Sequence, residues 1–183
     1  MALSKEEKRR IQKLIRQAKQ GDQAAFEKVV LLTQDRIFAH CWRISQDEQE
    51  AADATQEAFV KAWFKLKQFD SRRRFLPWLY RIATNNCFDF LRRVKKLVRF
   101  DQLEIGGEIW QTEKEDPDQK IRAEEIRQAV AQLPKKYRAA LSLYYFEGYR
   151  YQEIAQMMRA PLNTVKSWIR RGKEKLKLKL KPI

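Results

Sequence analysis

The sequence is poor in the residues that build disulfide frameworks, metal centres and turn-rich folds. Its 183 residues include two cysteines, one histidine, five glycines and five prolines. Two cysteines do not make a disulfide framework, and His40 beside Cys41 matches no recognisable zinc-binding spacing. We therefore interpret His40 and Cys41 as ordinary helix residues, and we expect neither a metal nor another cofactor.

Long apolar runs are also missing. No run approaches the roughly 20 residues that a membrane-spanning helix needs, and residues 1–19 are charged, without the apolar centre of a signal peptide. These two absences predict a protein that stays in the cytoplasm and does not insert into a membrane.

Signals for catalysis are equally scarce. An enzyme acting on nucleic acid would need acidic metal ligands, a Cys/His site or a phosphate-binding glycine loop, and the sequence shows none of these. We therefore expect no catalytic residues.

Positive charge, by contrast, is abundant and unevenly distributed. The formal net charge is +15 and the pI is near 9.9, which favours a polyanionic partner. Residues 126–183 carry fourteen basic and three acidic side chains, whereas residues 94–125 carry six basic and nine acidic ones. The acidic stretch, with Gly106-Gly107 and Pro117, is interpreted as a linker, although an ordinary solvated loop has a similar composition.

Helical periodicity runs through both halves of the chain. It predicts helices over about 5–19, 23–44, 48–66, 119–132, 135–146, 151–158 and 162–179. A further helix is expected to carry Pro77 in its first turn and to end near residues 93–97. Ser4 and Glu7 form a capping-box pattern before the first helix. The predicted fold class is all-α, with small helical domains over residues 1–95 and 120–183 and a linker over residues 96–119.

Residues 151–169 have the pattern of a helix-turn-helix, with a three-residue break at residues 159–161. The side chains expected to face inward are Ile154, Ala155, Met158, Val165 and Ile169. The second helix would enter the major groove of duplex DNA and present outward polar and basic side chains to bases and phosphates. These side chains are Asn163, Lys166, Ser167, Arg170 and Arg171. A charged solvated helix is the alternative, but the small Ala155, the break and the basic face together favour DNA binding.

Two positions near this break bear on its backbone. Asn163 is where tolerance of unusual backbone angles is expected to be useful. Arg159 stands in the turn, where glycine is frequent, and leaves the turn geometry open.

A predicted helix face over residues 53–63 mixes polar and apolar side chains. Its outward members are Asp53, Gln56, Glu57, Val60 and Lys61. Val60 among polar neighbours is compatible with a protein interface. From the pattern alone, an ordinary solvated helix face stays open as well.

Basic and aromatic residues are interleaved over residues 69–93. This combination holds single-stranded DNA, since rings stack on unpaired bases and cations meet phosphates. The loop before residue 75 could provide a pocket for a flipped base. Phe75 and Phe90 are interpreted as core residues, whereas Tyr80 and Asn85 are predicted to lie toward the polar side and to act in binding.

Two groups of motifs resemble, in order and spacing, the extracytoplasmic-function (ECF) family of bacterial RNA polymerase sigma factors. Asp53-x-x-Gln56-Glu57-Ala-Phe-x-Lys61 and Phe75-x-x-Trp78-Leu-Tyr-Arg-Ile-Ala-x-Asn85 resemble region two. Leu133-Pro134, Tyr137-Arg138, Tyr151-x-Glu-Ile-Ala155 and Thr164-Val-Lys-Ser167 resemble region four. The resemblance covers about residues 20–93 and 120–176.

The resemblance implies a non-catalytic subunit that directs transcription initiation, with a stress or envelope-response regulon. The face with Asp53, Gln56, Glu57, Val60 and Lys61 would dock on the clamp coiled coil of the largest polymerase subunit. The minus-10 element would be read and opened by Arg72, Arg73, Arg74, Tyr80, Arg81, Asn85 and Asp89. The minus-35 element would be bound as duplex by Asn163, Thr164, Lys166, Ser167, Arg170 and Arg171. The flap of the second-largest subunit and an anti-sigma factor are further expected partners.

Three departures from the family pattern leave the promoter preference open. Asn163 stands where glycine is frequent, Trp168 where arginine is common, and Asp89 where an amide often occurs. The alternative functions are a stand-alone helix-turn-helix regulator and a nucleic-acid enzyme. The regulator would leave the basic and aromatic cluster of residues 69–93 unexplained, and the enzyme lacks its site.

Overall fold

The computed structural model describes residues 3–97 and 125–180, with the side chains of the first range described as far as Asp89. Both ranges are helical and contain no strand, which confirms the all-α prediction. None of the described helices is long and apolar enough to cross a lipid bilayer. The first two residues of the linker predicted over residues 96–119 belong to a helix, and the rest of that linker lies outside the described residues. The start of the helix predicted over 119–132 also lies outside them.

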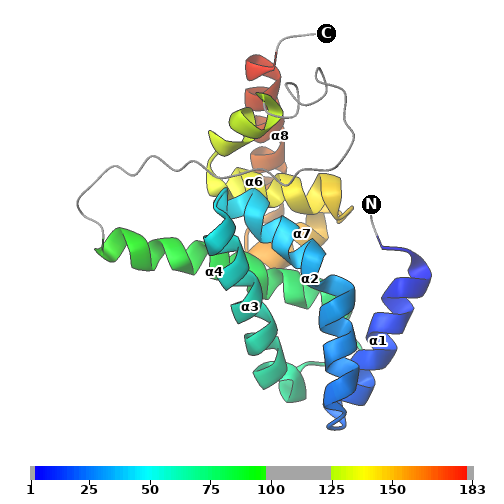
Figure 1. Ribbon diagram of the computed structural model, residues 1–183. Helices are drawn as coiled ribbons and strands as arrows, with labels where there is room; N and C mark the ends of the chain where they lie inside the picture. The colour runs from blue at the N-terminus through cyan, green and yellow to red at the C-terminus, as the bar shows by residue number, and fades with distance from the viewer. Residues whose placement is uncertain (1–2, 98–124, 181–183) are drawn as a thin grey trace, which may run out of the picture.

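The elements follow one another closely along the chain (Figure 1). They are α1 (Lys5–Lys19), α2 (Gln23–Ser45), α3 (Glu48–Lys65), η1 (Leu66–Gln68), α4 (Phe75–Leu97), a helical segment at 125–131, α6 (Lys135–Leu141), η2 (Ser142–Phe146), α7 (Tyr151–Met158) and α8 (Leu162–Lys179).

Side-chain caps fix where the first three helices begin. Ser4 Oγ accepts the backbone N–H of Glu7 at 3.1 Å, and the Glu7 carboxylate accepts the N–H of Ser4 at 2.8 Å. This completes the predicted capping box. Asp22 and Asp47 cap α2 and α3 by accepting backbone N–H groups three residues further on.

The helices α1 to α4 form a first domain around one apolar core. α2 packs along α1 and α3, and α4 packs against α3. Ile15, Val29 and Leu79 are fully buried where these helices meet, and Phe75 is buried as predicted. α4 begins at Phe75, so Pro77 lies in its first turn, where its missing N–H breaks no helical hydrogen bond.

Residues 125–180 form a smaller second domain that contains the helix-turn-helix. Ile154 of α7 and Val165 and Ile169 of α8 are buried, as predicted. Met157 is buried as well, and the predicted Ala155 and Met158 are half-buried and pack against the same core.

The helix predicted over residues 135–146 changes its winding halfway. α6 ends at Leu141, and η2 is a π-helical turn in which the Glu147 N–H donates to the Ser142 carbonyl at 3.3 Å. This wider turn places the buried Ser142 hydroxyl and the Glu147 carboxylate against the first domain, where both have partners.

The two domains pack against each other. α6 and η2 contact α2, and α7 contacts α4. α6 lies beside the C-terminal end of α2, far from the loop that joins α1 to α2 (Figure 1). This arrangement decides which of the predicted binding residues are accessible.

Candidate nucleic-acid interface

Residues 70–74, between η1 and α4, form an exposed loop that we call the arginine loop. The side chains of Arg72, Arg73 and Arg74 are 91%, 80% and 66% exposed. Asp70 accepts both the backbone N–H and the guanidinium of Arg72 at 3.0 Å, and this hydrogen bonding lowers the pKa of Asp70. Three adjacent guanidinium groups facing solvent make a strong site for phosphates.

Beneath the arginine loop lies an aromatic triad made of Phe69, Phe75 and Trp78. The ring centroids of Phe69 and Trp78 are 4.9 Å apart, and those of Phe75 and Trp78 are 5.5 Å apart. Phe69 and Phe75 are buried, whereas Trp78 is only half-buried. The triad therefore fixes the base of the loop and leaves one ring within reach of solvent.

A cavity of about 720 Å³ opens between the arginine loop, α4 and α7. Its walls combine guanidinium groups of Arg73 and Arg81 with the ring of Trp78 and the thioether of Met157. Burial lowers the pKa of Arg81, and the nearby positive charges of Arg159 and Arg73 act in the same direction. Such a cationic, partly aromatic cavity suits an anionic ligand that carries a planar ring.

Tyr80 does not lie on the accessible face that the sequence predicted. Its side chain is 1% exposed, and its hydroxyl donates to Glu147 at 2.5 Å. Burial is the main cause that raises the pKa of this phenol. The prediction was wrong for this arrangement, because the second domain covers the part of α4 from which Tyr80 projects.

The remaining predicted minus-10 residues of α4 are partly accessible. Arg81, Asn85 and Asp89 are half-buried. The adjacent Asn86, by contrast, is buried and donates to the Ala54 carbonyl at 3.1 Å. The packing therefore distinguishes the two neighbouring asparagines, with Asn85 on the open side.

Glu147 is the acceptor at the centre of the contact between the domains. Its side chain is 7% exposed, and Arg36 donates to it at 2.8 Å beside the Tyr80 bond. The guanidinium of Arg43 lies 3.9 Å from the same carboxylate and 3.9 Å from the centroid of the Phe146 ring. Sequence reasoning missed Glu147, although it is one of only three acidic residues in the strongly basic segment 126–183.

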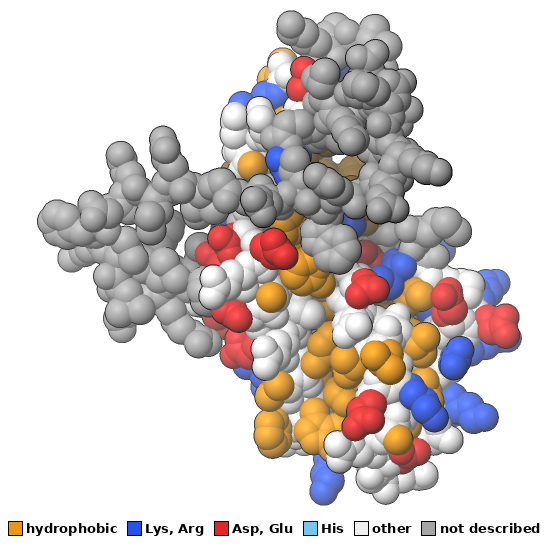
Figure 2. All heavy atoms as spheres, in the orientation of Figure 1, with side chains coloured by type: hydrophobic (Ala, Val, Ile, Leu, Met, Phe, Trp, Pro, Cys, Tyr) orange, Lys and Arg blue, Asp and Glu red, His pale blue; other side chains and the backbone are white. Residues whose placement is uncertain are grey.

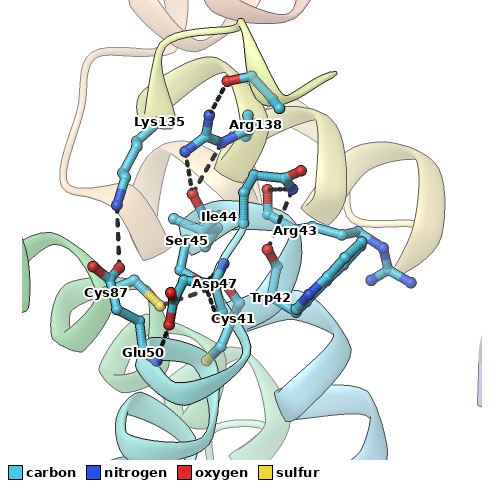
Figure 3. Close-up of polar contacts among 12 residues, drawn as sticks. Cys41, Trp42, Arg43, Ile44, Ser45, Asp47, Glu50, Cys87, Lys135 and Arg138 are labelled. Atoms are coloured by element: carbon cyan, nitrogen blue, oxygen red, sulfur yellow. Dashed lines mark hydrogen bonds and ion pairs between the residues drawn. The ribbon is translucent and has the colours of Figure 1, made fainter. Parts of the chain in front are cut away.

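A second polar contact joins α6 to the end of α2 (Figure 3). The Arg138 Nε and Nη2 atoms donate to the Ile44 carbonyl at 2.9 and 2.5 Å. A guanidinium is favourable there, because the C-terminal carbonyls of a helix carry partial negative charge. Lys135 lies 3.3 Å from the Glu50 carboxylate of α3 (Figure 3).

His40 lies between the two domains and uses both ring nitrogens. Nδ1 is 3.0 Å from Ser142 Oγ of the second domain, and Nε2 is 2.9 Å from Thr84 Oγ1 of α4. Burial, with the positive charge of Arg43 acting in the same direction, lowers the pKa of His40 to about 3. We call the contacts of Arg36, His40, Ile44, Glu50 and Tyr80 with the second domain the domain seam.

The predicted duplex-binding face of α8 is open to solvent. Asn163, Lys166, Arg170 and Arg171 are exposed, and Thr164 and Ser167 are half-buried. Arg170 is paired with Glu174 one turn further on, at 2.7 Å. The expected unusual backbone angle occurs at Arg159, with φ of 50°, and not at Asn163, which lies within α8.

The predicted docking face of α3 is accessible as well. Asp53, Gln56 and Val60 are exposed. Lys61 donates to Glu57 and to Asn86 of α4, each at 2.8 Å, so these side chains are held in place.

Exposed apolar side chains surround this face on α2 and α3. Leu31 and Phe64 are 70% and 77% exposed. Hydrophobic side chains gather over this part of the first domain (Figure 2). An apolar hollow of about 450 Å³ adjoins Val60. Grouped apolar exposure favours a protein interface over a solvated face.

Comparison with known proteins finds two family matches in chain order. The Sigma-70 region 2 family matches residues 29–97, and the Sigma-70, region 4 family matches residues 123–176. The ECF RNA polymerase sigma factor SigW of Bacillus subtilis (strain 168) is 36% identical, over 94% of this chain and 98% of its own. The ECF RNA polymerase sigma-E factor of Escherichia coli (strain K12) is 33% identical, over 94% and 95%.

A solved structure shares the fold. It is that of the sigma factor RpoE from Bartonella quintana, in complex with the anti-sigma factor NepR. Its TM-score is 0.71 at 22% identity, and the match covers 84% of this chain and 95% of that one.

Proposed function

This chain belongs to the ECF family of RNA polymerase sigma factors, and on that basis we propose which of its surfaces bind polymerase and which bind promoter DNA. A sigma factor is a non-catalytic subunit that acts in transcription initiation. The observation that carries the assignment is the occurrence, on one chain, of an arginine loop over an aromatic triad and of an outward basic face on α8.

The arginine loop and α4 bind the minus-10 element and help to open it. Arg72, Arg73 and Arg74 contact phosphates of the unpaired strand, and an extruded base stacks on Trp78, on the side of the cavity that the loop and α4 keep when the domains separate. Stacking on one aromatic ring contributes about 1–3 kcal/mol per base, which helps to offset the cost of unpairing.

α8 binds the minus-35 element as duplex. Its N-terminal turn brings Asn163, Thr164 and Lys166 to base edges, and Arg170 and Arg171 contact phosphates. Val165 and Ile169 are buried on the opposite side, so the helix orientation is fixed by its own core.

α3 docks on the clamp coiled coil of the largest polymerase subunit through Asp53, Gln56, Glu57, Val60 and Lys61. The exposed Leu31 and Phe64 extend this surface with apolar area. The flap of the second-largest subunit binds the second domain. Because polymerase works in the cytoplasm, the protein acts there.

The domains must separate before both promoter elements are bound. About 25 base pairs between positions −35 and −10 span roughly 85 Å at about 3.4 Å per pair. A compact chain of this length has a radius of gyration of about 16 Å, hence a diameter near 40 Å. Polymerase binding therefore opens the domain seam, which also uncovers Tyr80 for the minus-10 element.

An anti-sigma factor is a further proposed partner. The RpoE structure from Bartonella quintana contains NepR, and another neighbour, CnrH, was solved with the cytosolic domain of CnrY. Regulation of this kind fits a stress or envelope-response regulon.

The assignment is tested by adding the purified chain to core polymerase with a library of promoters from the source genome. We expect new transcripts with specific start sites. Tight duplex binding without any effect on transcription would contradict the proposal.

The docking face is tested with Asp53→Ala combined with Gln56→Ala. Core affinity is expected to fall at least tenfold, while the circular dichroism spectrum and melting temperature stay unchanged, because both side chains are exposed. The matched control combines Gln17→Ala with Glu27→Ala, two exposed residues of α1 and α2. Equal core affinity of the two double variants would show that the docking face is misassigned.

A further inference from the structure

α1 touches the arginine loop through one side chain that makes three hydrogen bonds to backbone atoms. Gln12 Nε2 donates to the carbonyls of Ser71 and Arg73, each at 3.0 Å. Its Oε1 accepts the N–H of Phe75 at 3.1 Å. The amide thus uses its donors and its acceptor on a single five-residue stretch.

These three bonds fix the backbone on both sides of the exposed guanidinium groups. The two carbonyls belong to residues directly before Arg72 and Arg74. The N–H of Phe75 is the first amide of α4, which has no partner within its own helix. Gln12 therefore sets both the shape of the loop and its junction with α4.

A second side chain of α1 holds the residue directly before the loop. Lys19 Nζ donates to the Phe69 carbonyl at 2.5 Å. α1 itself is anchored, because Ile11 and Ile15 are buried in the core of the first domain. The anchored α1 can therefore hold the loop in a fixed position.

The loop has few tertiary anchors apart from α1. Asp70 accepts from Arg72 within the loop. Arg74 pairs with Glu153 of α7, but this contact belongs to the second domain and is lost when the domains separate. Once the seam opens, the Gln12 bonds still tie the loop to α1 of its own domain, and the Lys19 bond still holds Phe69 directly before the loop.

We propose that α1, through Gln12 and with the support of Lys19, positions the arginine loop for the minus-10 element. Gln12 is a positioning residue that touches no DNA. It holds the backbone of the loop in its binding shape before DNA arrives, so less conformational entropy is lost on binding. The inference rests on the proposed minus-10 role of the loop, and the matched Sigma-70 region 2 begins only at residue 29, beyond α1.

The test compares two DNAs bound by holoenzyme made from core polymerase and the full chain. One is a fork with an unpaired minus-10 strand, and the other is a duplex that carries the minus-35 element alone. Gln12→Met keeps the length of the side chain and removes its hydrogen bonds. We expect the fork to bind about tenfold more weakly and the duplex to bind unchanged. The control is Gln17→Met, an exposed residue of the same helix, with both affinities unchanged.

Amide hydrogen exchange is measured alongside the two DNA affinities. In Gln12→Met, the amide of Phe75 is expected to exchange its hydrogen faster, whereas amides in the middle of α4 keep their rates. An unchanged fork affinity, or an equal loss on both DNAs, would overturn the positioning role. If Gln12→Met does not fold, Lys19→Met with the same two DNAs decides, and an unchanged ratio of affinities overturns the proposal.

The proposed function and this inference fail in different ways. If the wild-type holoenzyme does not prefer the fork over a fork with a scrambled minus-10 strand, the minus-10 assignment fails. If the wild type shows that preference and Gln12→Met shows it equally, only the inference fails.

Discussion

At the scale of single residues, the backbone conformation of Arg159 and the burial of His40 affect stability in ways that composition does not reveal. Arg159 ends α7 in the left-handed region with φ of 50°, and its N–H donates to the Ala155 carbonyl. A residue with a Cβ atom pays about 1–2 kcal/mol for this conformation, whereas glycine adopts it freely. The helix-turn-helix is thus built with an arginine where glycine would be less strained.

Replacing Arg159 with glycine is expected to stabilise the second domain. Arg159→Gly should raise the free energy of unfolding by about 1 kcal/mol, measured by urea denaturation, because the left-handed strain is relieved. Arg159→Ala is the control, since it removes the same charge and keeps the Cβ atom. If both variants are more stable than the wild type by the same amount, the removed charge, and not the relieved backbone strain, is responsible for the gain.

His40 is expected to make the protein sensitive to acid. Its pKa in the folded state is lowered to about 3, whereas the unfolded value is near 6.5. The folded state thus binds this proton less readily, so the stability from neutral His40 is fully present above pH 6.5. It is lost as the pH falls toward 3, by about 1.4 kcal/mol per pH unit.

The wild type and His40→Gln are compared by denaturant unfolding between pH 7 and pH 4. Glutamine keeps polar contacts to Ser142 and Thr84 but does not titrate. We expect the stability of the wild type to fall more steeply below pH 6.5 than that of His40→Gln. Parallel curves would show that His40 titrates normally in the folded protein.

At the scale of elements, one helix separates its structural side from its binding side. Val165 and Ile169 hold α8 in the second domain, while Asn163, Lys166 and Arg171 face solvent. Substitutions on the exposed face are therefore expected to change DNA binding without changing the fold. α3 likewise has a buried face and an exposed face, so the exposed substitutions Asp53→Ala and Gln56→Ala should leave its packing intact.

Lys166 is expected to contribute one ionic contact to duplex binding. Lys166→Ala should weaken minus-35 binding by holoenzyme and reduce the slope of log affinity against log salt by about one unit. Binding of the minus-10 fork by the same preparation is the internal control. A slope identical to the wild type would remove Lys166 from the phosphate contacts.

At the scale of the whole molecule, the proposed function makes access to DNA depend on the balance between packed and separated domains. Glu147 brings together Arg36 and Tyr80 from two helices of the first domain. Opening the seam would expose these groups to water, and in the proposed function the binding of polymerase supplies the energy for the separation. The strength of the seam should therefore set how readily the free chain samples the open form.

Glu147→Gln is expected to weaken the domain contact by about 1–1.5 kcal/mol for each of the two hydrogen bonds that the carboxylate accepts, because each charge-assisted bond is replaced by a neutral one. Fluorophores on α1 and α8 of the free chain should report a larger separation in this variant. Glu174→Gln is the matched control, since Glu174 pairs with Arg170 inside α8. The same separation in wild type and Glu147→Gln would show that the seam does not depend on this carboxylate.

The sequence by itself determined the helices, their caps and the faces of α3 and α8. Ser4, Asp22 and Asp47 cap their helices through hydrogen bonds to residues three positions further on. Because the partners are so close in the sequence, such caps can be predicted from it.

Only the tertiary structure decided that Tyr80 is buried. It also decided that Glu147 and His40 join the two domains and that Gln12 bonds the arginine loop. Tyr80 and Glu147 are 67 residues apart, and Gln12 and Phe75 are 63 apart. No periodicity links such distant positions. Their pairing depends on how the helices and the two domains pack, and that packing buries a tyrosine whose place in its helix pattern predicts exposure.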